Sequence, residues 1–334
     1  MPRTRNRLLA LMAAVLTATL MALTGAPEAQ AFPARSKQDV LDYLRSTAGS
    51  GIVSGQHNKE PASAPSQYTQ QVKDVTGQYP GLWGGDLMFR PDDVANRQRV
   101  IDQAKNEWKN GSLVALTWHV CTPTGGSSCE FDGGVKTSIS DEQFSDILTD
   151  GTELNAAWKR RLDEAVPYLQ QLKDAGVPAL FRPLHEMNEQ WNWWGHRPGA
   201  DGSAELYRLT RDYLEGTKGL DNLIWVWNVQ DSPAGDWSSY YPGDDYVDVA
   251  SLDAWYKDYP SQSDYEQLRG IAGAKPIALA ETGKVPDASL LESQPAWSYF
   301  MIWSEQLRGN NSDDEIKATY SDSRVLNQGE LALD

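Results

Sequence analysis

The chain has 334 residues, with 46 acidic and 30 basic side chains and a formal net charge of −16 at pH 7. Such an acidic protein is not expected to bind nucleic acid or anionic membranes, whereas a neutral partner fits its charge. The length allows one barrel-sized domain or two smaller ones. No linker-like stretch or change of composition divides the chain, which favours a single domain.

Residues 1–31 have the pattern of a secretory signal peptide. Three arginines lie within the first seven residues, an apolar stretch covers residues 8–23, and Ala29-Gln30-Ala31 forms a small-x-small cleavage site. A membrane anchor is the alternative, but the apolar run is short for a span. We therefore expect an exported protein, cleaved after Ala31, whose single domain covers residues 32–334.

Beyond this segment, helical stretches alternate with short apolar runs. The predicted helices lie around residues 40–44, 100–108, 155–175 with a kink at Pro167, 204–217 and 265–272. The predicted strands lie around residues 52–57, 82–88, 113–119, 177–181, 223–228, 247–253, 276–281 and 299–303. The last thirty or so residues read as a final helix and a polar tail.

Eight apolar strands separated by helices are typical of a parallel sheet that is covered on its faces. This number of repeats in one domain predicts an α/β fold, a single-domain (β/α)8 TIM barrel. A doubly wound open sheet is the alternative. The sequence lacks the glycine-rich nucleotide-binding turn that such a sheet often carries after its first strand, which makes the alternative weaker.

A long insertion is predicted between the third and fourth strands, over residues 120–150. It contains Cys121 and Cys129, the two cysteines of the chain, in a segment rich in Gly and Ser. In an exported protein this pair could close as a disulfide. A pair of free thiols is the alternative, and the sequence alone leaves both open.

Polar and aromatic side chains recur where the predicted strands end. They are Gln56, His57, Asp86, Trp118, His119, His185, Glu186, Asn228, Asp253, Glu281 and Trp303. In a barrel the carboxyl ends of the strands meet on one face, and active sites lie on that face. The sequence therefore predicts a single polar site there.

Glu186 and Glu281 are the candidate catalytic pair, since each directly follows an apolar strand. Glycoside hydrolysis uses two carboxyl groups, one to protonate the leaving oxygen and one to attack or to activate water. Tryptophans 191, 193, 194, 255 and 303 are expected to wall a sugar cleft, because indole faces stack on sugar rings. The alternative is a structural Arg182–Glu186 ion pair beneath packed tryptophans.

Other chemistries have weaker support. None of the four histidines lies in an HExxH motif or at the spacing of a Cys-His zinc site, so a catalytic metal is not expected. Hydrolysis by two carboxyl groups needs no cofactor, and none is expected. No GxSxG turn follows a strand, which argues against a serine hydrolase.

Several of these residues together resemble the motifs of glycoside hydrolase family 26, over roughly residues 36–305. The longest motif is Arg182-Pro183-Leu184-His185-Glu186-Met187-Asn188, followed by Trp191 and Trp193-Trp194-Gly195; shorter ones are Ser54-Gly55-Gln56-His57, Trp118-His119 and Ala280-Glu281-Thr282-Gly283. That family consists mostly of endo-β-1,4-mannanases. The resemblance implies a (β/α)8 barrel that hydrolyses with retention, with Glu186 as acid/base and Glu281 as nucleophile.

The resemblance also implies supporting roles. His119 and His185 would contact the sugar or orient the carboxylates, and Trp191 would line the leaving-group side. Trp303 would form the floor under the cleaved sugar. Arg182 would hold a carboxylate by paired hydrogen bonds.

The chain departs from the family pattern at two places. The family usually has Asp-x-Tyr after strand six, with the tyrosine bonding the nucleophile, but this chain reads Asp253-Ala254-Trp255-Tyr256. Either Trp255 fills the place of the tyrosine or Tyr256 reaches it by a shifted backbone. Position 189 is Glu where the family often has Gly, and this side chain either faces solvent or crowds the leaving-group side.

The leading hypothesis is a secreted, monomeric endo-β-1,4-mannanase that acts on mannan, glucomannan or galactomannan. A mixed-linkage β-glucanase or a β-xylanase on the same scaffold is the first alternative. The pocket would separate these substrates by how it treats the hydroxyl at C2, and His119, Asn228 and Asp253 are candidates to read it. A glycan-binding protein without catalysis is the alternative from another class.

Overall fold

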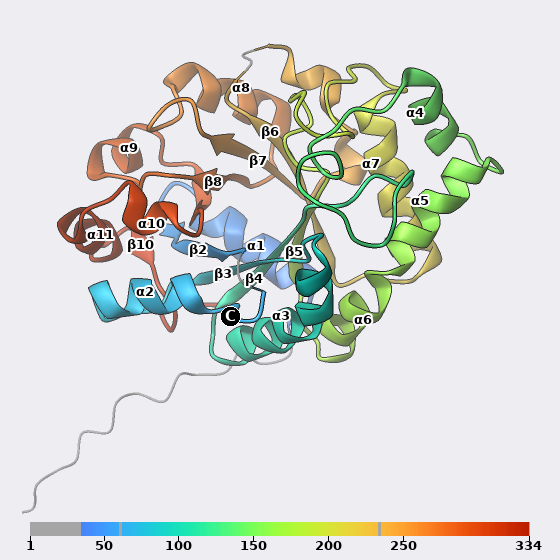
Figure 1. Ribbon diagram of the computed structural model, residues 1–334. Helices are drawn as coiled ribbons and strands as arrows, with labels where there is room; N and C mark the ends of the chain where they lie inside the picture. The colour runs from blue at the N-terminus through green and yellow to red at the C-terminus, as the bar shows by residue number, and fades with distance from the viewer. Residues whose placement is uncertain (1–34, 60–61, 233–234, 334) are drawn as a thin grey trace, which may run out of the picture.

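The computed structural model describes residues 35–59, 62–232 and 235–333. The predicted signal peptide lies outside the described residues. Figure 1 shows strands in the middle of the domain with helices around them. Among the described residues, no helix has the length and apolar character that a membrane crossing needs.

The strands form a closed parallel barrel, which confirms the predicted (β/α)8 fold over an open sheet. Neighbouring strands pair from β2 through to β8, and β9 closes the ring by pairing with both β8 and β2. The strands are β1 (Ile52–Val53), β2 (Gly55–Asn58), β3 (Leu82–Asp86), β4 (Leu113–Trp118), β5 (Ala179–Pro183), β6 (Leu223–Gln230), β7 (Val249–Ala254), β8 (Ile277–Thr282), β9 (Trp297–Ile302) and β10 (Val325–Leu326).

Helices follow most strands and cover the outside of the barrel (Figure 1). They are α1 (Lys37–Thr47), α2 (Gln67–Thr76), α3 (Pro91–Lys109), α4 (Asp141–Leu148), α5 (Glu153–Asp163), α6 (Val166–Asp174), α7 (Ser203–Arg211), α8 (Gln262–Ala272), α9 (Ala288–Ser293), α10 (Gln306–Gly309) and α11 (Asp313–Tyr320). A π-helical turn, η1 (Asp212–Thr217), extends α7, and two 3-10 turns, η2 (Trp237–Tyr240) and η3 (Asp244–Tyr246), precede β7.

Several helix starts are encoded locally. The Ser36 hydroxyl accepts the backbone N–H of Asp39, and the Asp39 carboxylate accepts the backbone N–H of Ser36. The same reciprocal pair of bonds starts α4, α8 and α11. Such a capping box satisfies two backbone donors that the helix itself leaves free.

Two predicted elements are interrupted in the structure. The first strand is split into β1 and β2 at Ser54, whose hydroxyl donates to Asn327 Oδ1 at 2.9 Å. The single helix expected over residues 155–175 is wrong, because α5 ends at Asp163 and α6 begins at Val166. Pro167 lies in the first turn of α6, where its missing N–H costs no helical bond. A new helix therefore starts there, in place of a kink.

Gly55 allows β2 and β9 to approach each other where the ring closes. A Cβ atom at this position would lie 2.3 Å from the backbone oxygen of Phe300. Backbone cannot move aside as a flexible side chain can, so a larger residue would push the two strands apart.

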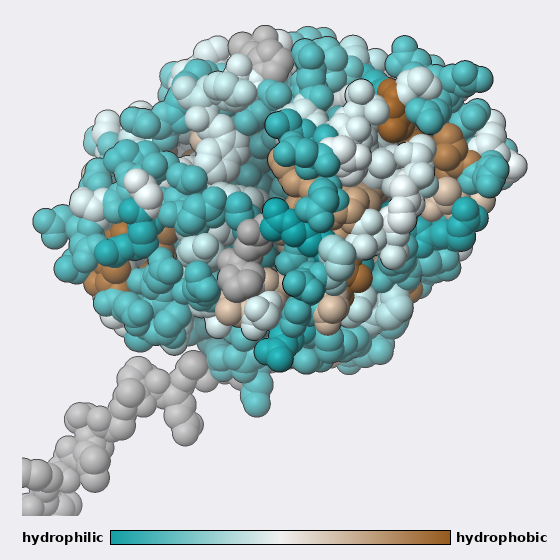
Figure 2. All heavy atoms as spheres, in the orientation of Figure 1, coloured by the Kyte–Doolittle hydropathy of each residue, from teal (hydrophilic) through white to brown (hydrophobic). Residues whose placement is uncertain are grey.

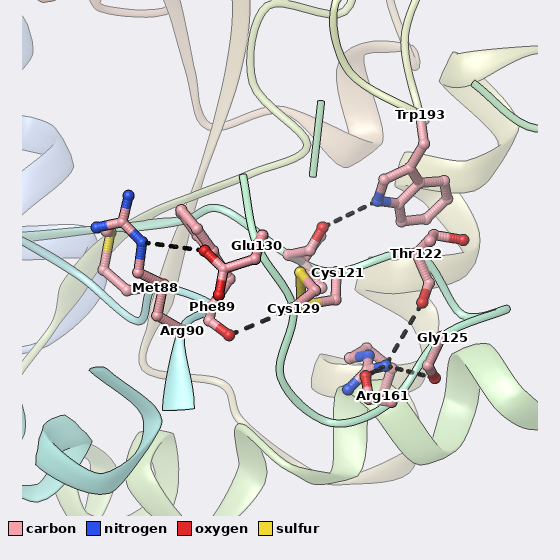
Figure 3. The surroundings of a disulfide bond; sticks show 12 residues. Met88, Phe89, Arg90, Cys121, Thr122, Gly125, Cys129, Glu130, Arg161 and Trp193 are labelled. Carbon is pink, nitrogen blue, oxygen red and sulfur yellow. Dashed lines mark hydrogen bonds and ion pairs between the residues drawn. A yellow bond between two sulfur atoms is a disulfide. The ribbon is translucent and has the colours of Figure 1, made fainter. Parts of the chain in front are cut away.

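The insertion after β4 is tied down at several points, and its two cysteines form a disulfide (Figure 3). The backbone N–H of Cys129 donates to the Phe89 carbonyl at 2.9 Å, in the connection that leads to α3. Arg161 of α5 donates to the carbonyls of Thr122 and Gly125. The insertion is thus held against the β3–α3 connection and against helix α5, which follows it in the chain.

The surface is polar, as the composition suggests. Figure 2 shows a mostly hydrophilic face on which hydrophobic side chains form only small, separate patches. Among the described residues, Tyr256 is the large hydrophobic side chain that stands exposed, at 68%.

Candidate active site

Three carboxylates meet at the carboxyl end of the barrel. Glu186 lies three residues beyond the end of β5 at Pro183, Asp253 lies in β7 and Glu281 lies in β8. One oxygen atom from each lies within 4.8 Å of those of the other two. All three side chains are buried, so like charges are crowded in a place with little water to screen them.

Arg182 of β5 supplies the positive charge for this group. Its Nη1 atom donates to Asp253 Oδ2 at 2.7 Å, and its Nη2 atom donates to Glu281 Oε1. The guanidinium therefore bridges two carboxylates, and the alternative of an Arg182–Glu186 pair is wrong. Burial lowers the pKa of Arg182, but Asp253 and Glu281 outweigh it and raise that pKa above its usual range.

The backbone around Glu186 is strained. Leu184 and Glu186 have φ angles of 53° and 51°, in the left-handed region that non-glycine residues seldom adopt. The Glu186 backbone N–H donates to Asn228 Oδ1 at 2.7 Å, which helps to hold this conformation. Strain of this kind costs about 1–3 kcal/mol per residue and is concentrated at functional sites.

The Glu186 side chain lies in a less polar setting than that of Glu281. Its Oε2 atom accepts a hydrogen bond from Trp191 Nε1 at 2.5 Å. Burial, followed by the charges of Asp253 and Glu281, raises the pKa of Glu186 well above its ordinary value. Of the two glutamates, Glu281 has a direct bond to a cation and Glu186 has a bond to an indole.

Asn228 and Asp253 are buried, and neither lines the cavity that His119 and Trp303 line. The Asn228 side chain donates to Asp253 Oδ1 at 2.8 Å, while its oxygen accepts the Glu186 N–H. Asp253 is 0% exposed, and its second oxygen accepts from Arg182. Both residues are expected sugar contacts in the sequence, but their polar atoms are engaged inside the protein. The structure places them as supports for Glu186 and Arg182.

An aromatic surface lies beside the carboxylates. Trp303, directly after β9, stacks on His57 with ring centroids 4.2 Å apart, and the Lys59 ammonium lies 5.2 Å from its ring centroid. Trp255 meets Trp303 edge-on at 6.3 Å, whereas Tyr256 is 68% exposed. Of the two candidates for the family's tyrosine position, Trp255 is therefore the one next to the aromatic floor.

The tryptophans after β5 divide into two kinds. Trp191 is half-buried, but Trp193 and Trp194 are 0% exposed, so the expectation that these two wall the cleft is wrong. Their indole N–H groups donate to the backbone oxygens of Val120 and His185. They anchor the loop to its neighbours, because a buried indole N–H needs a partner inside the protein.

The two predicted histidines lie together. The rings of His119 and His185 meet edge-to-face with centroids 4.4 Å apart. His185 is buried, and burial, followed by the neighbouring His119 and Arg182, lowers its pKa well below the usual value. It is therefore neutral at ordinary pH. His119 lines a cavity of about 360 Å³ together with Trp303.

Two aromatic residues of this cavity were missed in the sequence. Phe89 and Phe131 line it, with ring centroids 5.9 Å apart, and Phe131 also lies 5.7 Å from Trp191. Phe131 follows Cys129 in the insertion, so the disulfide-tied segment supplies part of the wall. The signal available in the sequence was an aromatic residue set among Gly and Ser beside the cysteines.

Glu189, the departure from the family's Gly, does not face solvent. It is only 9% exposed, and its Oε1 atom has no hydrogen-bond partner in the protein. Burial raises the pKa of Glu189, while His196 opposes this and Asp231 adds to it.

Within residues 35–59, 62–232 and 235–333, the three clustered carboxylates are also the group whose spacing suits a metal ion. Arg182 already binds two of them. A guanidinium and a cation would compete for the same oxygens, so the donor set fits an ion-pair network better than a metal centre.

Comparison with known proteins gives a consistent picture. Residues 29–330 match Glycosyl hydrolase family 26. The chain is 32% identical to a mannan endo-1,4-beta-mannosidase from Bacillus subtilis over 78% of this chain and 76% of that protein. It is 34% identical to a mannan endo-1,4-beta-mannosidase from Thermothelomyces thermophilus, over 89% of this chain but 61% of the longer relative.

Solved structures agree. GH26A from Muricauda sp. MAR_2010_75 superposes with a TM-score of 0.84 at 35% identity, covering 92% of this chain and 98% of that one. A beta-mannanase from a symbiotic protist of the termite Reticulitermes speratus, complexed with gluco-manno-oligosaccharide, superposes with a TM-score of 0.78 at 27% identity. That match covers 91% of this chain and 97% of the other.

Proposed function

The chain belongs to glycosyl hydrolase family 26, and we propose that it acts as a secreted, retaining endo-β-1,4-mannanase. The observation that carries the proposal is the pairing of Glu186 with Glu281. Their oxygens lie within 4.8 Å, close to the ~5–5.5 Å carboxyl separation of retaining glycosidases and below the ~6.5–9.5 Å of inverting ones.

In the first step, Glu281 attacks the anomeric carbon while Glu186 gives its proton to the glycosidic oxygen. The bond from the anomeric carbon to that oxygen breaks, the leaving sugar departs as an alcohol, and a glycosyl ester forms on Glu281. In the second step, Glu186 takes a proton from water, and the water oxygen displaces Glu281. Two displacements at one carbon retain the anomeric configuration.

The surroundings of the two glutamates support Glu281 as the nucleophile and Glu186 as the acid/base. Arg182 binds Glu281 through Oε1, so Oε2 is available for attack. Glu186, buried beside Trp191, has the raised pKa that keeps a general acid protonated. Trp303 lines the cavity and offers an apolar ring to the sugar whose bond is cleaved, and Trp191, which binds Glu186, lines the leaving-group side.

The substrate follows from the named relatives. The relatives from B. subtilis and T. thermophilus are mannan endo-1,4-beta-mannosidases, and the termite-symbiont enzyme was solved with gluco-manno-oligosaccharide. Mannan, glucomannan and galactomannan are therefore the proposed substrates. We further propose export after cleavage at Ala31, a single catalytic domain over residues 32–334, and action as a monomer.

The test is a product profile of the purified mature protein on mannan, glucomannan, mixed-linkage β-glucan and xylan. Short manno-oligosaccharides are expected from the first two substrates alone, and early proton NMR spectra should show the β-anomer first. Release from β-glucan or xylan would overturn the substrate, and an initial α-anomer would overturn retention. Binding without release from any substrate would support a glycan-binding protein.

The raised pKa of Glu186 gives a pH prediction. Below this pKa the carboxyl group is protonated and can donate to the leaving oxygen; above it the group is ionised and cannot. The kcat/KM should therefore fall as pH rises through a pKa well above the ~4.3 of an ordinary glutamate. A pH profile on a mannan oligosaccharide measures this.

The control for that profile is an activated aryl β-mannoside, whose leaving group needs no proton. The fall of its glycosylation rate at high pH should be weaker. If the rates on both substrates fall equally steeply as pH rises, the fall must come from the titration of a group other than Glu186.

A further inference from the structure

Asp86, the last residue of β3, has its carboxylate fully engaged with His119. Its Oδ2 atom lies 2.6 Å from His119 Nδ1, and its Oδ1 atom accepts the His119 backbone N–H at 3.2 Å. The same oxygen accepts the Met88 backbone N–H at 2.9 Å. Asp86 is 1% exposed, so it cannot touch a sugar itself.

The turn that carries Asp86 is held in place from outside the barrel. Arg97 of α3 donates to the carbonyls of Leu87 and Met88 at 2.6 and 2.7 Å. Met88 has a φ of 48°, a left-handed conformation that a side chain other than glycine adopts only when its surroundings hold it there. The position of Asp86 is therefore set by structure on both sides of it.

His119 is the member of this group that reaches the cleft. It lines the cavity beside Phe89 and Trp303, and its ring packs edge-on against His185. The ring is thus fixed by Asp86 at Nδ1 and by aromatic neighbours on its sides. Nε2 is the nitrogen that remains for a ligand.

The chemistry of the pair decides what Nε2 can do. Burial alone would raise the pKa of Asp86, but the hydrogen bonds from His119 and from the Met88 N–H help to lower it below its usual range. Asp86 is therefore a carboxylate, which only accepts hydrogen bonds. A neutral His119 must then carry its proton on Nδ1, and Nε2 becomes an acceptor.

We propose that Asp86 is a positioning residue for the reaction: it fixes the ring and tautomer of His119, so that Nε2 accepts a hydrogen bond from a sugar hydroxyl in the cavity. The role in the reaction rests on the proposed function. The tautomer does not, because it follows from the Asp86–His119 contact alone.

The first experiment needs no variant. The protein contains four histidines, so nitrogen-15 labelling of histidine gives a spectrum with few signals. For the neutral His119 ring, the long-range proton–nitrogen couplings should show a protonated Nδ1 and a bare Nε2. A proton on Nε2 in the wild-type protein would overturn the proposal, whether or not the protein hydrolyses mannan.

The second experiment uses Asp86→Asn. The amide oxygen can still accept the two backbone N–H groups, but the amide nitrogen now donates to Nδ1 and forces the proton onto Nε2. We expect the NMR tautomer to switch and kcat/KM to fall about 10- to 100-fold, the loss found when the partner that orients a metal-binding histidine is removed. Unchanged kcat/KM with a switched tautomer would overturn the role in the reaction.

The third experiment separates positioning from stability. If Asp86 acts through His119, then Asp86→Asn should cost less than about twofold in a His119→Ala background, because coupled residues are not additive. A full loss in that background would overturn the proposal. The matched control is Asp248→Asn. Asp248 directly precedes β7, at the other end of the barrel, and its carboxylate accepts the Trp225 backbone N–H. It should leave the tautomer and kcat/KM unchanged.

Discussion

Glu281→Gln is expected to abolish hydrolysis while the protein remains folded. The amide oxygen can still accept from Arg182, so the ion-pair network loses one charge but keeps its shape. An amide cannot form the glycosyl ester, and loss of a nucleophile typically lowers kcat by about 10⁴-fold or more. The measurement is the initial rate of reducing-sugar release from glucomannan.

The control for this variant is Glu266→Gln, the same chemical change at an exposed position on α8. It should retain wild-type kcat and KM. Binding of manno-oligosaccharide by Glu281→Gln, measured by calorimetry, should persist, since the aromatic surface is unchanged. Hydrolysis by Glu281→Gln at more than about one hundredth of the wild-type rate would exclude Glu281 as the nucleophile.

Arg182→Met is expected to destabilise the protein more than most single substitutions. The methionine fills much of the volume of the arginine but leaves Asp253 and Glu281 buried without a cation. Removing one partner of a buried charge network costs about 3–5 kcal/mol, because the remaining charges stay desolvated. Urea denaturation at neutral pH gives the free energy of unfolding directly.

The sign of its pH dependence gives a second test. Burial already raises the pKa of Asp253 to about 8, although Arg182 lowers it, so removing the guanidinium should raise this pKa further. A folded-state pKa above the unfolded value means that stability falls as pH rises, so the destabilisation should shrink on acidification. Arg45→Met, which breaks the exposed pair with Asp42, should cost at most about 1 kcal/mol. If Arg182→Met also lowers the free energy of unfolding by no more than about 1 kcal/mol, the ion pairs of Arg182 do not stabilise the fold as proposed.

The positions of the two glutamates could be predicted because of one topological fact. In a barrel of parallel strands, every carboxyl end points to the same face, so residues that follow apolar runs must gather there. Glu186 and Glu281 lie 95 positions apart in the chain, yet the strand pattern alone predicts that they meet. The helix starts at Ser36 and Ser261 are likewise local, since the capping partner lies three residues away.

The direction of each side chain could not be predicted in this way. Trp191, Trp193 and Trp194 look alike in the sequence, but the last two are buried by groups from elsewhere in the chain. Asn228 and Asp253 have the residue types of sugar ligands. In the structure, however, Asp253 accepts a hydrogen bond from Arg182, and Asn228 accepts one from the Glu186 backbone. Which partner a polar side chain binds depends on the groups that the fold brings near it, and the sequence does not show these groups.

The sequence by itself therefore determined the barrel, the face that carries the site and the two glutamates, because these depend on periodicity and strand order. The tertiary structure decided the rest: the bridge from Arg182 to Asp253 and Glu281, the contact between Asp86 and His119, and the place of Phe131 in the cavity wall. The physical reason is that hydrogen bonds and burial depend on distances of a few ångströms between segments far apart in the chain. Residue spacing along the sequence does not contain those distances.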